Sequence, residues 1–181
     1  MNVWFIADTH FCHGNILKHC HRPFGSVQDH DQELIRRWNS LVQPKDEVYH
    51  LGDVAFQSNP QFLCDKILNK LNGRIFLIKG NHDKNVIRGP ALERFVWVKD
   101  VYSLKIQPSV VHGAYGDQPL EFFLSHYAHR VWNKSHHGVP HLYGHSHGGL
   151  PAHGKSFDVG VDCWDFYPIS LETVMEKLKT L

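Results

Sequence analysis

The first half of the chain alternates short apolar runs with segments of helical spacing. Residues 3–7, 47–51 and 75–78 are predominantly apolar and each leads into a polar loop, which predicts three buried strands. Residues 60–71 carry a proline at the start and a glycine after the end, which predicts a helix. An earlier helix, with Asp29 or Asp31 as its N-cap, is predicted from Leu34, Ile35, Trp38, Leu41 and Val42.

The second half is richer in strand signals, and Ser170 is the predicted N-cap of a last helix. βα units followed by a β-rich half predict an α/β fold of layered sheets covered by helices. The length and the lack of a linker predict a single domain over residues 1–181. The candidate strands, separated by Gly, Pro and Asp as in antiparallel hairpins, are residues 95–98, 101–106, 110–112 and 122–124, with weaker signals at 142–143 and 157–161.

Composition changes this picture through the histidine content. Hydrophobic residues make up 42% of the chain and charged residues 20%, which is ordinary, but 16 of the 181 residues are histidine. Neutral imidazole is the commonest metal ligand and titrates nearest neutral pH, so the excess favours metal binding or acid–base chemistry. The formal net charge of +1 gives no basic field that would attract nucleic acid or a membrane.

The N-terminal segment and the cysteines set the expected compartment. The first apolar run lacks a basic segment before it and ends at Asp8, so it does not resemble a secretory signal. No stretch approaches the roughly 20 apolar residues of a membrane span. The four cysteines lie far apart without a CxxC pair, which indicates reduced thiols. We therefore expect a soluble cytoplasmic protein.

Clusters of Asp, His and Asn follow the predicted strands. Reacting groups in open α/β sheets collect at the carboxyl ends of the strands, so these loops can converge on one crevice. Alternate residues of an extended segment face the same way, so the two histidines of the last cluster can reach one site together. The five clusters are Asp8-Thr9-His10, Gly52-Asp53, Gly80-Asn81-His82-Asp83, Ser125-His126 and Gly144-His145-Ser146-His147.

The ligand types in these clusters suit divalent cations. Carboxylate, imidazole and amide oxygen without thiolate favour Mn, Fe, Zn or Mg. Taken singly, each residue has a simpler explanation, because an isolated strand-end Asp usually belongs to a turn and an isolated His is usually a hydrogen-bonded core or loop residue. The clusters together supply enough ligands for the paired metals of a phosphoesterase, which lie roughly 3.5–4 Å apart. Their joint occurrence favours a two-metal site.

In content and order, the clusters resemble the calcineurin-like metallophosphoesterase family. The family pattern is DxH, GD, GNH followed by Asp or Glu, a lone His and GHxH, and the resemblance covers residues 3 to about 165. It implies a four-layer α-β-β-α sandwich of two mainly mixed sheets flanked by helices, in a small member without a cap domain. It also implies two divalent metal ions, with Mn favoured and Fe, Zn, Ni or Mg as alternatives.

The resemblance further implies a role for each position. In the family mechanism, the metals generate a hydroxide from a shared water, and this hydroxide attacks phosphorus in line. His82, which is not a ligand, would protonate the leaving alkoxide or stabilise its charge, and Asp83 could orient His82. The implied ligands are Asp8, His10 and His147 for one metal, Asn81, His126 and His145 for the other, and Asp53 as the bridge between them.

Four residues outside the motifs are weaker candidates for substrate contact. His13 and Asn15 follow the first motif closely enough to face the crevice. Arg22 or Arg130 could offer a guanidinium to a phosphate group, although a solvated loop arginine is the alternative for both. The simpler interpretations of other polar residues near the motifs are turn residues for Asp158 and Asp162 and a buried inert thiol for Cys12.

One departure from the superfamily narrows the function. Phosphoprotein phosphatases follow GD with a further Asp-Arg-Gly, whereas this chain continues Val54-Ala55-Phe56-Gln57, which argues against protein phosphatase activity. The prediction is a phosphoesterase that hydrolyses a phosphodiester or phosphomonoester, with a nucleotide or cyclic nucleotide as the favoured substrate. Two alternatives stay open. One is a non-catalytic metal-binding scaffold of the same fold, and the other is a nuclease, which would need a basic groove.

Overall fold

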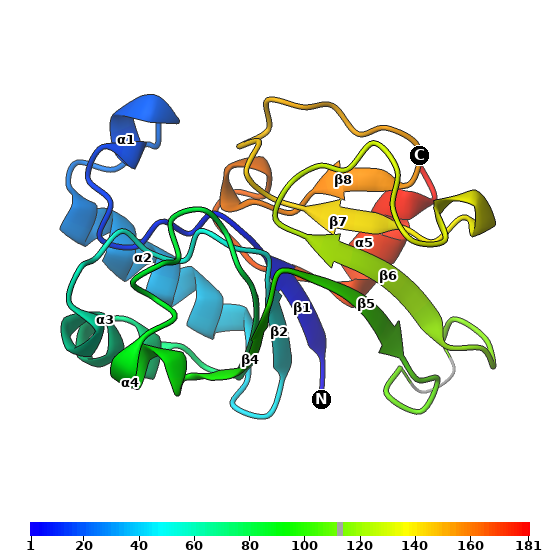
Figure 1. Ribbon diagram of the computed structural model, residues 1–181, viewed down its shortest axis with the longest axis horizontal. Coiled ribbons are helices and arrows are strands. Elements are labelled where there is room, and N and C mark those ends of the chain that lie inside the picture. The colour runs from blue at the N-terminus through cyan, green and yellow to red at the C-terminus, as the bar shows by residue number, and fades with distance from the viewer. Residues whose placement is uncertain (112–113) are drawn as a thin grey trace.

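Two β-sheets form the centre of the molecule (Figure 1). The computed structural model describes residues 1–111 and 114–181. The first sheet has the strand order β4-β3-β2-β1-β9, and its strands run parallel except β9, which pairs antiparallel with β1. These strands are β1 (Val3–Ile6), β2 (Glu47–His50), β3 (Arg74–Ile78), β4 (Phe95–Lys99) and β9 (Ile169–Ser170).

The second sheet has the strand order β5-β6-β7-β8. Strands β5 and β6 pair antiparallel as predicted, whereas β4, which was predicted to belong to the same set of hairpins, pairs parallel with β3 in the first sheet. Strands β6, β7 and β8 are parallel because long loops return the chain to the same end each time. At the predicted strand 110–112, Val110 and Val111 lie in a turn and His112 lies outside the described residues. The strands are β5 (Val101–Ile106), β6 (Leu120–Ser125), β7 (His141–Tyr143) and β8 (Ser156–Asp158).

Helices cover the face of the first sheet that points away from the second (Figure 1). Leu34 and Trp38 of α2 share a buried cluster with Val48 of β2 and Ile75 of β3. In the described part of the chain, no helix is long and apolar enough to cross a membrane. The helices are α1 (Ile16–His19), α2 (Val27–Leu41), α3 (Pro60–Lys66), α4 (Gly89–Leu92) and α5 (Leu171–Leu178), with short 3₁₀ turns η1 (Leu68–Lys70), η2 (Ser135–His137) and η3 (Val161–Cys163).

A second apolar cluster lies between the two sheets. Phe5 of β1 and Phe122 of β6 meet there with ring centroids 5.8 Å apart. Leu171 and Val174 of α5 join the same cluster. Alternate residues of each strand thus face the helices or the other sheet, as the strand period of two requires. The predicted α/β sandwich of two mixed sheets with helices is confirmed.

The helix ends differ from prediction in two places. Helix α2 begins at Val27 because Ser26, in extended conformation, accepts the N–H of Asp29 at 3.1 Å, so neither predicted aspartate is the N-cap. The predicted helix 60–71 is divided, since Ile67 leaves helical geometry and η1 follows α3. The predicted cap of α5 is confirmed, with Ser170 Oγ accepting the N–H of Thr173 at 3.1 Å.

A buried carboxylate fixes the start of β1 against the start of β2. Asp46, which is 2% exposed, accepts the N–H of Asn2 at 2.7 Å, the N–H of Gln43 at 3.0 Å and the indole N–H of Trp4 at 3.0 Å. Burial alone would raise the pKa of Asp46, but these donors outweigh it and the pKa lies below its ordinary value. The ionised carboxylate therefore stabilises the fold.

We predict that Asp46→Ala lowers the free energy of unfolding by about 2–4 kcal/mol, because three donors lose a charged acceptor. Urea unfolding would measure it. The folded pKa of Asp46 is depressed, so its stabilisation is present above pH ~4 and is lost as pH falls through the folded pKa. The difference in the free energy of unfolding between wild type and Asp46→Ala should therefore become smaller in acid.

The matched control is Asp100→Ala, whose side chain is 77% exposed in a surface pair with Lys79. It should change stability by less than about 0.5 kcal/mol. Equal effects of the two substitutions, or a gap for Asp46→Ala that stays constant down to acid pH, would contradict the assigned role.

Candidate metal centre

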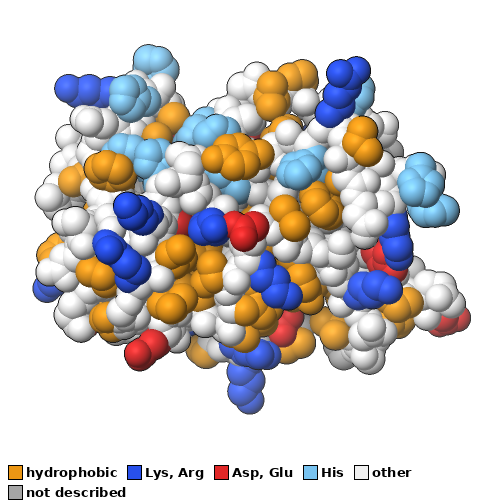
Figure 2. Space-filling model, in the orientation of Figure 1, with side chains coloured by type: hydrophobic (Ala, Val, Ile, Leu, Met, Phe, Trp, Pro, Cys, Tyr) orange, Lys and Arg blue, Asp and Glu red, His pale blue; other side chains and the backbone are white. Residues whose placement is uncertain are grey.

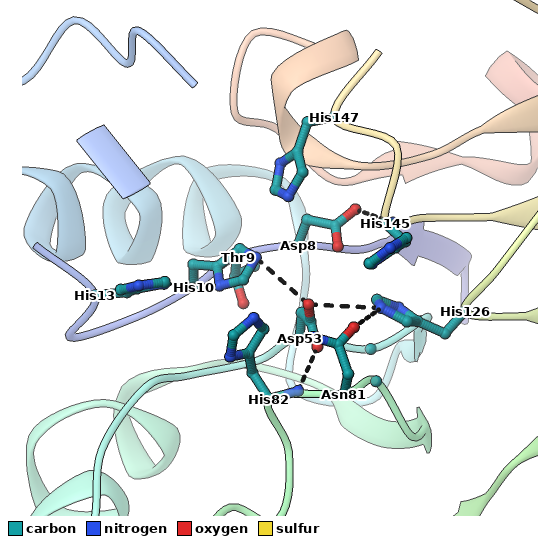
Figure 3. Close-up of polar contacts among 12 residues, drawn as sticks. Asp8, Thr9, His10, His13, Asp53, Asn81, His82, His126, His145 and His147 are labelled. Atoms are coloured by element: carbon teal, nitrogen blue, oxygen red, sulfur yellow. Dashed lines mark hydrogen bonds and ion pairs between the residues drawn. The ribbon is translucent and has the colours of Figure 1, made fainter. Parts of the chain in front are cut away.

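Residues of the five predicted clusters meet in one crevice at the carboxyl ends of strands from both sheets (Figure 3). The loops after β1, β2 and β3 supply one side of it, and the loops after β6 and β7 supply the other. Figure 2 shows histidine side chains gathered along the upper part of the molecule in this view, with hydrophobic side chains beside them. The convergence predicted from strand-end positions is thus seen in the structure.

The first ligand group consists of Asp8, His10 and His147. One ligand atom from each lies within 4.8 Å of the others, although His147 comes from the second sheet. The imidazoles of His10 and His147 stack with centroids 5.2 Å apart. These three residues are the set for which the family resemblance implies one shared metal.

The second ligand group consists of Asp53, His126 and His145, again within 4.8 Å of one another. Asn81 joins it, because its Oδ1 lies 3.2 Å from His126 Nε2. In Figure 3, His126 and His145 lie on the opposite side of Asp53 from His10. The structure therefore also assembles the residues assigned to the other metal.

Asp53 of the second group also lies close to the first group. Its Oδ2 is 3.6 Å from His10 Nε2 and 3.5 Å from His126 Nε2. Both separations are longer than a hydrogen bond. They are shorter than the combined length of two metal–ligand bonds of about 2.1 Å each, so a single cation could contact both atoms of either pair. This position suits the bridging carboxylate that two cations would share.

Two buried ligand atoms, Asp8 Oδ1 and His10 Nε2, have no hydrogen-bond partner among the described residues. Buried polar atoms without partners are rare because they are unfavourable. Burial raises the pKa of Asp8 to about 8 and lowers the pKa of His10 to about 2. A divalent cation against both atoms would stabilise the carboxylate and bind the neutral imidazole, so these residues fit the metal that the donor set implies.

The pKa of Asp53 shifts the opposite way. Burial alone would raise it, but the nearby His126 imidazole, whose Nε2 is 3.5 Å from Asp53 Oδ2, and the backbone N–H of His82, 2.9 Å from Asp53 Oδ1, hold it well below its ordinary value. Asp53 is therefore ionised at neutral pH, as a bridging ligand must be.

Outer hydrogen bonds set the orientation of two imidazoles. His126 Nδ1 lies 2.8 Å from the carbonyl oxygen of Leu51, which can only accept, so Nδ1 carries the proton and Nε2 presents its lone pair to the crevice. His147 Nδ1 lies 2.7 Å from Asp162 Oδ2, which leaves its Nε2 available in the same way. Both residues are thus held in the orientation that metal binding requires.

Arg22 and Asp162 support the first ligand group from behind. Arg22 Nε and Nη2 donate to the Asp162 carboxylate at 2.8 and 2.7 Å, and Nη2 also donates to the carbonyl oxygen of Asp8 at 2.7 Å. The Arg22 side chain has 0% exposure, which conflicts with its predicted contact to a substrate phosphate. The interpretation of Asp162 as a simple turn residue is incomplete, because its carboxylate also positions His147.

Asp83 joins two motif loops instead of orienting His82. Its carboxylate accepts the backbone N–H groups of Asp53, Val54 and Gly80 at 2.9, 2.8 and 2.8 Å. Burial raises the pKa of Asp83 to about 6. The last residue of the GNHD motif therefore fixes the loop that carries Asp53.

Most of the ligand residues have left-handed backbone, which is uncommon outside glycine. This conformation is unfavourable by about 1–2 kcal/mol for a residue with a Cβ, and such residues concentrate at functional sites. Here it turns the chain sharply at the strand ends so that successive side chains enter the crevice. The ligands with φ between 47° and 65° are Asp8, His10, Asp53, His145 and His147.

The motif glycines are required by close approach between the loops. A Cβ at Gly80 would lie 2.2 Å from Asp53 Oδ1, and one at Gly52 would lie 2.5 Å from His126 Nδ1. Real Cβ atoms essentially never come this close. Any side chain at either position would displace a ligand.

The remaining sequence candidates lie at different distances from the crevice. His13 is adjacent to it, with Nδ1 3.1 Å from His10 Nδ1. Asn15 and Arg130 are exposed, and within the described residues their side chains form no hydrogen bond or ion pair. Of these three, only His13 is brought into contact with a ligand.

Two aromatic residues beside the ligands were missed from the sequence. Phe56 is 56% exposed and its ring lies 5.6 Å from that of His82. Tyr127 is 48% exposed and its hydroxyl donates to Asn81 Oδ1 at 3.3 Å. Each lies within three residues of a motif ligand, which is the signal that would have found them.

Known proteins resemble this chain over nearly its full length. An uncharacterized protein of Methanocaldococcus jannaschii is 30% identical over 184 residues, covering 98% of this chain and 91% of that protein. The Gene 66 protein of Mycobacterium phage D29 is 29% identical over 189 residues, covering 93% and 92%. A crystal structure of a protein of unknown function from Aquifex aeolicus shares the fold, with a TM-score of 0.69, 24% identity and 98% coverage of both chains.

A sequence model of the family described as Calcineurin-like phosphoesterase matches residues 1–173. The match includes all five motif clusters and both ligand groups. This chain therefore belongs to the calcineurin-like phosphoesterase family.

Proposed function

We propose that residues 1–181 form one domain that hydrolyses a phosphodiester or phosphomonoester with two divalent cations, Mn being the first candidate. The observation that supports this most directly is the position of Asp53 Oδ2, which lies 3.6 Å from His10 Nε2 of the first group and 3.5 Å from His126 Nε2 of the second. One cation would be held by each group, with Asp53 shared.

When bound, the two cations would lower the pKa of a coordinated water toward neutral and offset the charge on the phosphoryl oxygens. The chain's own residues would set the geometry of this reaction. Asp53 and Asp8 carry the negative charge that retains the cations, and Asp162 keeps His147 oriented. Asn81, exposed at the rim, offers an amide next to the second group.

His82 is our candidate for the general acid. Its backbone N–H is fixed on Asp53 Oδ1 at 2.9 Å, and its ring lies 5.3 Å from that of His10. Its side chain is half-buried at the edge of the crevice and belongs to neither ligand group. From there it can protonate the oxygen of the leaving alcohol.

The retained ligands favour an enzyme over a non-catalytic scaffold of the same fold. A scaffold has no need for a partly exposed imidazole beside two complete ligand groups. A nucleotide or cyclic nucleotide is the proposed substrate class, because the net charge of +1 does not favour long nucleic acid.

The first prediction from the proposed function is metal-dependent hydrolysis of p-nitrophenyl phosphate or bis-p-nitrophenyl phosphate with Mn, Ni, Mg or Zn. Loss of a residue that only hydrogen-bonds a metal ligand typically lowers activity by roughly 10–100-fold. Asp53→Asn should lower kcat/KM by more than this, because it removes the negative charge that both cations would share. Asp100→Asn, on the surface, is the matched control. Absence of metal-dependent turnover on both esters would overturn the proposed activity.

A second prediction concerns the loop packing that holds Asp53. Gly80→Ala should weaken Mn²⁺ binding by about tenfold or more, since its Cβ would lie 2.2 Å from Asp53 Oδ1. Gly14→Ala is the matched control, because a Cβ there meets nothing within 4 Å. Calorimetric titration of both variants with Mn²⁺ would measure it. Equal metal affinity in both would contradict the close-approach argument.

A third prediction tests His82. His82→Gln should lower kcat by about 10²–10⁴-fold for an alkyl ester, whose leaving oxygen needs a proton. The loss should be much smaller for a p-nitrophenyl ester, because p-nitrophenolate leaves without one. Mn²⁺ affinity serves as the control and should not change. An equal loss for both leaving groups would assign His82 a structural role instead.

A further inference from the structure

Phe56 exposes a ring that the surrounding backbone holds in place. Its N–H donates to the carbonyl oxygen of Phe11 at 2.9 Å, next to the bridge between Phe11 and Ala55. Val54 and Ala55 are buried, whereas Phe56 is 56% exposed. One face of the ring stacks on His13, with centroids 4.6 Å apart and planes 24° apart. The exposed phenyl is therefore fixed by its neighbours.

A single exposed hydrophobic residue is ordinary, but Phe56 also borders a hollow. The hollow has a volume of about 400 Å³, within the range of small-molecule sites. Its wall combines a phenyl ring and an imidazole with amide, hydroxyl and ammonium groups, and the residues around it in the described chain include no carboxylate. The residues around it include Phe56, Gln57, Ser58, Asn81, His82 and Lys84.

The hollow opens from the metal centre on the side of His82. Asn81 lines the hollow and also lies 3.2 Å from His126 Nε2 through its Oδ1. The His82 ring faces Phe56 edge-on at 5.6 Å and lies 5.3 Å from the His10 ring. In Figure 3, His82 and His13 lie on the same side of Asp53. A leaving group that occupied the hollow would thus place the oxygen that joins it to phosphorus within reach of His82.

We propose that this hollow binds the leaving group of the substrate and that the leaving group is a nucleoside whose base stacks on Phe56. This inference rests on the proposed function, in which His82 protonates the leaving oxygen. Hydrolysis then breaks the bond between phosphorus and the nucleoside oxygen, adds the oxygen of one water to phosphorus and transfers one proton to the nucleoside.

The chemistry of the wall favours a base over an alkyl chain. A flat heteroaromatic ring gains stacking on the exposed Phe56 ring, and this gain does not depend on which base is present. Gln57 offers an amide to the edge of a base, and the Lys84 ammonium attracts its carbonyl oxygens. A long alkyl group would leave these polar groups without partners.

The test compares dithymidine monophosphate with two analogues in which an abasic tetrahydrofuran replaces one nucleoside or the other. Product analysis identifies the leaving side. With Mn²⁺, loss of the base on the leaving side should lower kcat/KM by about tenfold, and loss of the other base should have a smaller effect. Phe56→Ala should remove this discrimination and Phe56→Trp should restore it. Phe62→Ala, which removes another exposed phenylalanine, should retain it.

A binding measurement separates this proposal from the proposed function. Calorimetry with Mn²⁺ present compares thymidine 5′-phosphate with its abasic analogue. Tighter binding of the base-bearing compound in wild type, weakened by Phe56→Ala, would support the subsite even if no ester were hydrolysed. Equal affinity for the two compounds, or discrimination that persists in Phe56→Ala, would overturn it even if bis-p-nitrophenyl phosphate were hydrolysed.

Discussion

The packing of the loop after β3 against the Asp53 carboxylate, in the loop after β2, determines the geometry of the whole centre. A Cβ at Gly80 would lie 2.2 Å from Asp53 Oδ1, so only glycine allows this approach. Asp83 then holds both loops by accepting the N–H groups of Asp53 and Gly80 at 2.9 and 2.8 Å. Hydrogen bonds to charged groups contribute about 1.5–3 kcal/mol each, so the loops do not separate easily. The position of Asp53 close to both ligand groups is therefore a property of the backbone packing.

This packing concentrates negative charge where water is excluded. Asp8 and Asp53 are buried within the same crevice, and Asp158 adds to the field that raises the pKa of Asp8. Arg22 is buried next to them, but its guanidinium is already engaged by Asp162. Buried carboxylates are unfavourable unless cations or hydrogen bonds compensate them. The electrostatics and the strained backbone at the ligands both agree with the proposed cation site.

The sequence was most informative where the signal is local. Apolar runs ending in Gly, Asp or Asn predicted β1, β2 and β3 and the loops that follow them, because these signals lie within a few residues. Sheet partners are not local, so the parallel pairing of β7 and β8 was missed. Arg22 was misjudged for the same reason, since its partner Asp162 lies 140 residues away. Left-handed backbone at ligands such as Asp8 depends on tertiary packing, and although Asp and His adopt it more readily than most residues, the residue type alone does not predict it.

Each ligand group combines residues from both sheets, so the interface between the sheets serves the chemistry directly. His10 after β1 is grouped with His147 after β7, and Asp53 after β2 is grouped with His126 after β6. A slide of one sheet over the other would separate ligands within both groups at once. The apolar cluster between the sheets resists such a slide, because close-packed interiors are hardly compressible. Cations bound by both groups would in turn hold the sheets together, since a ligand that binds only the folded state stabilises it.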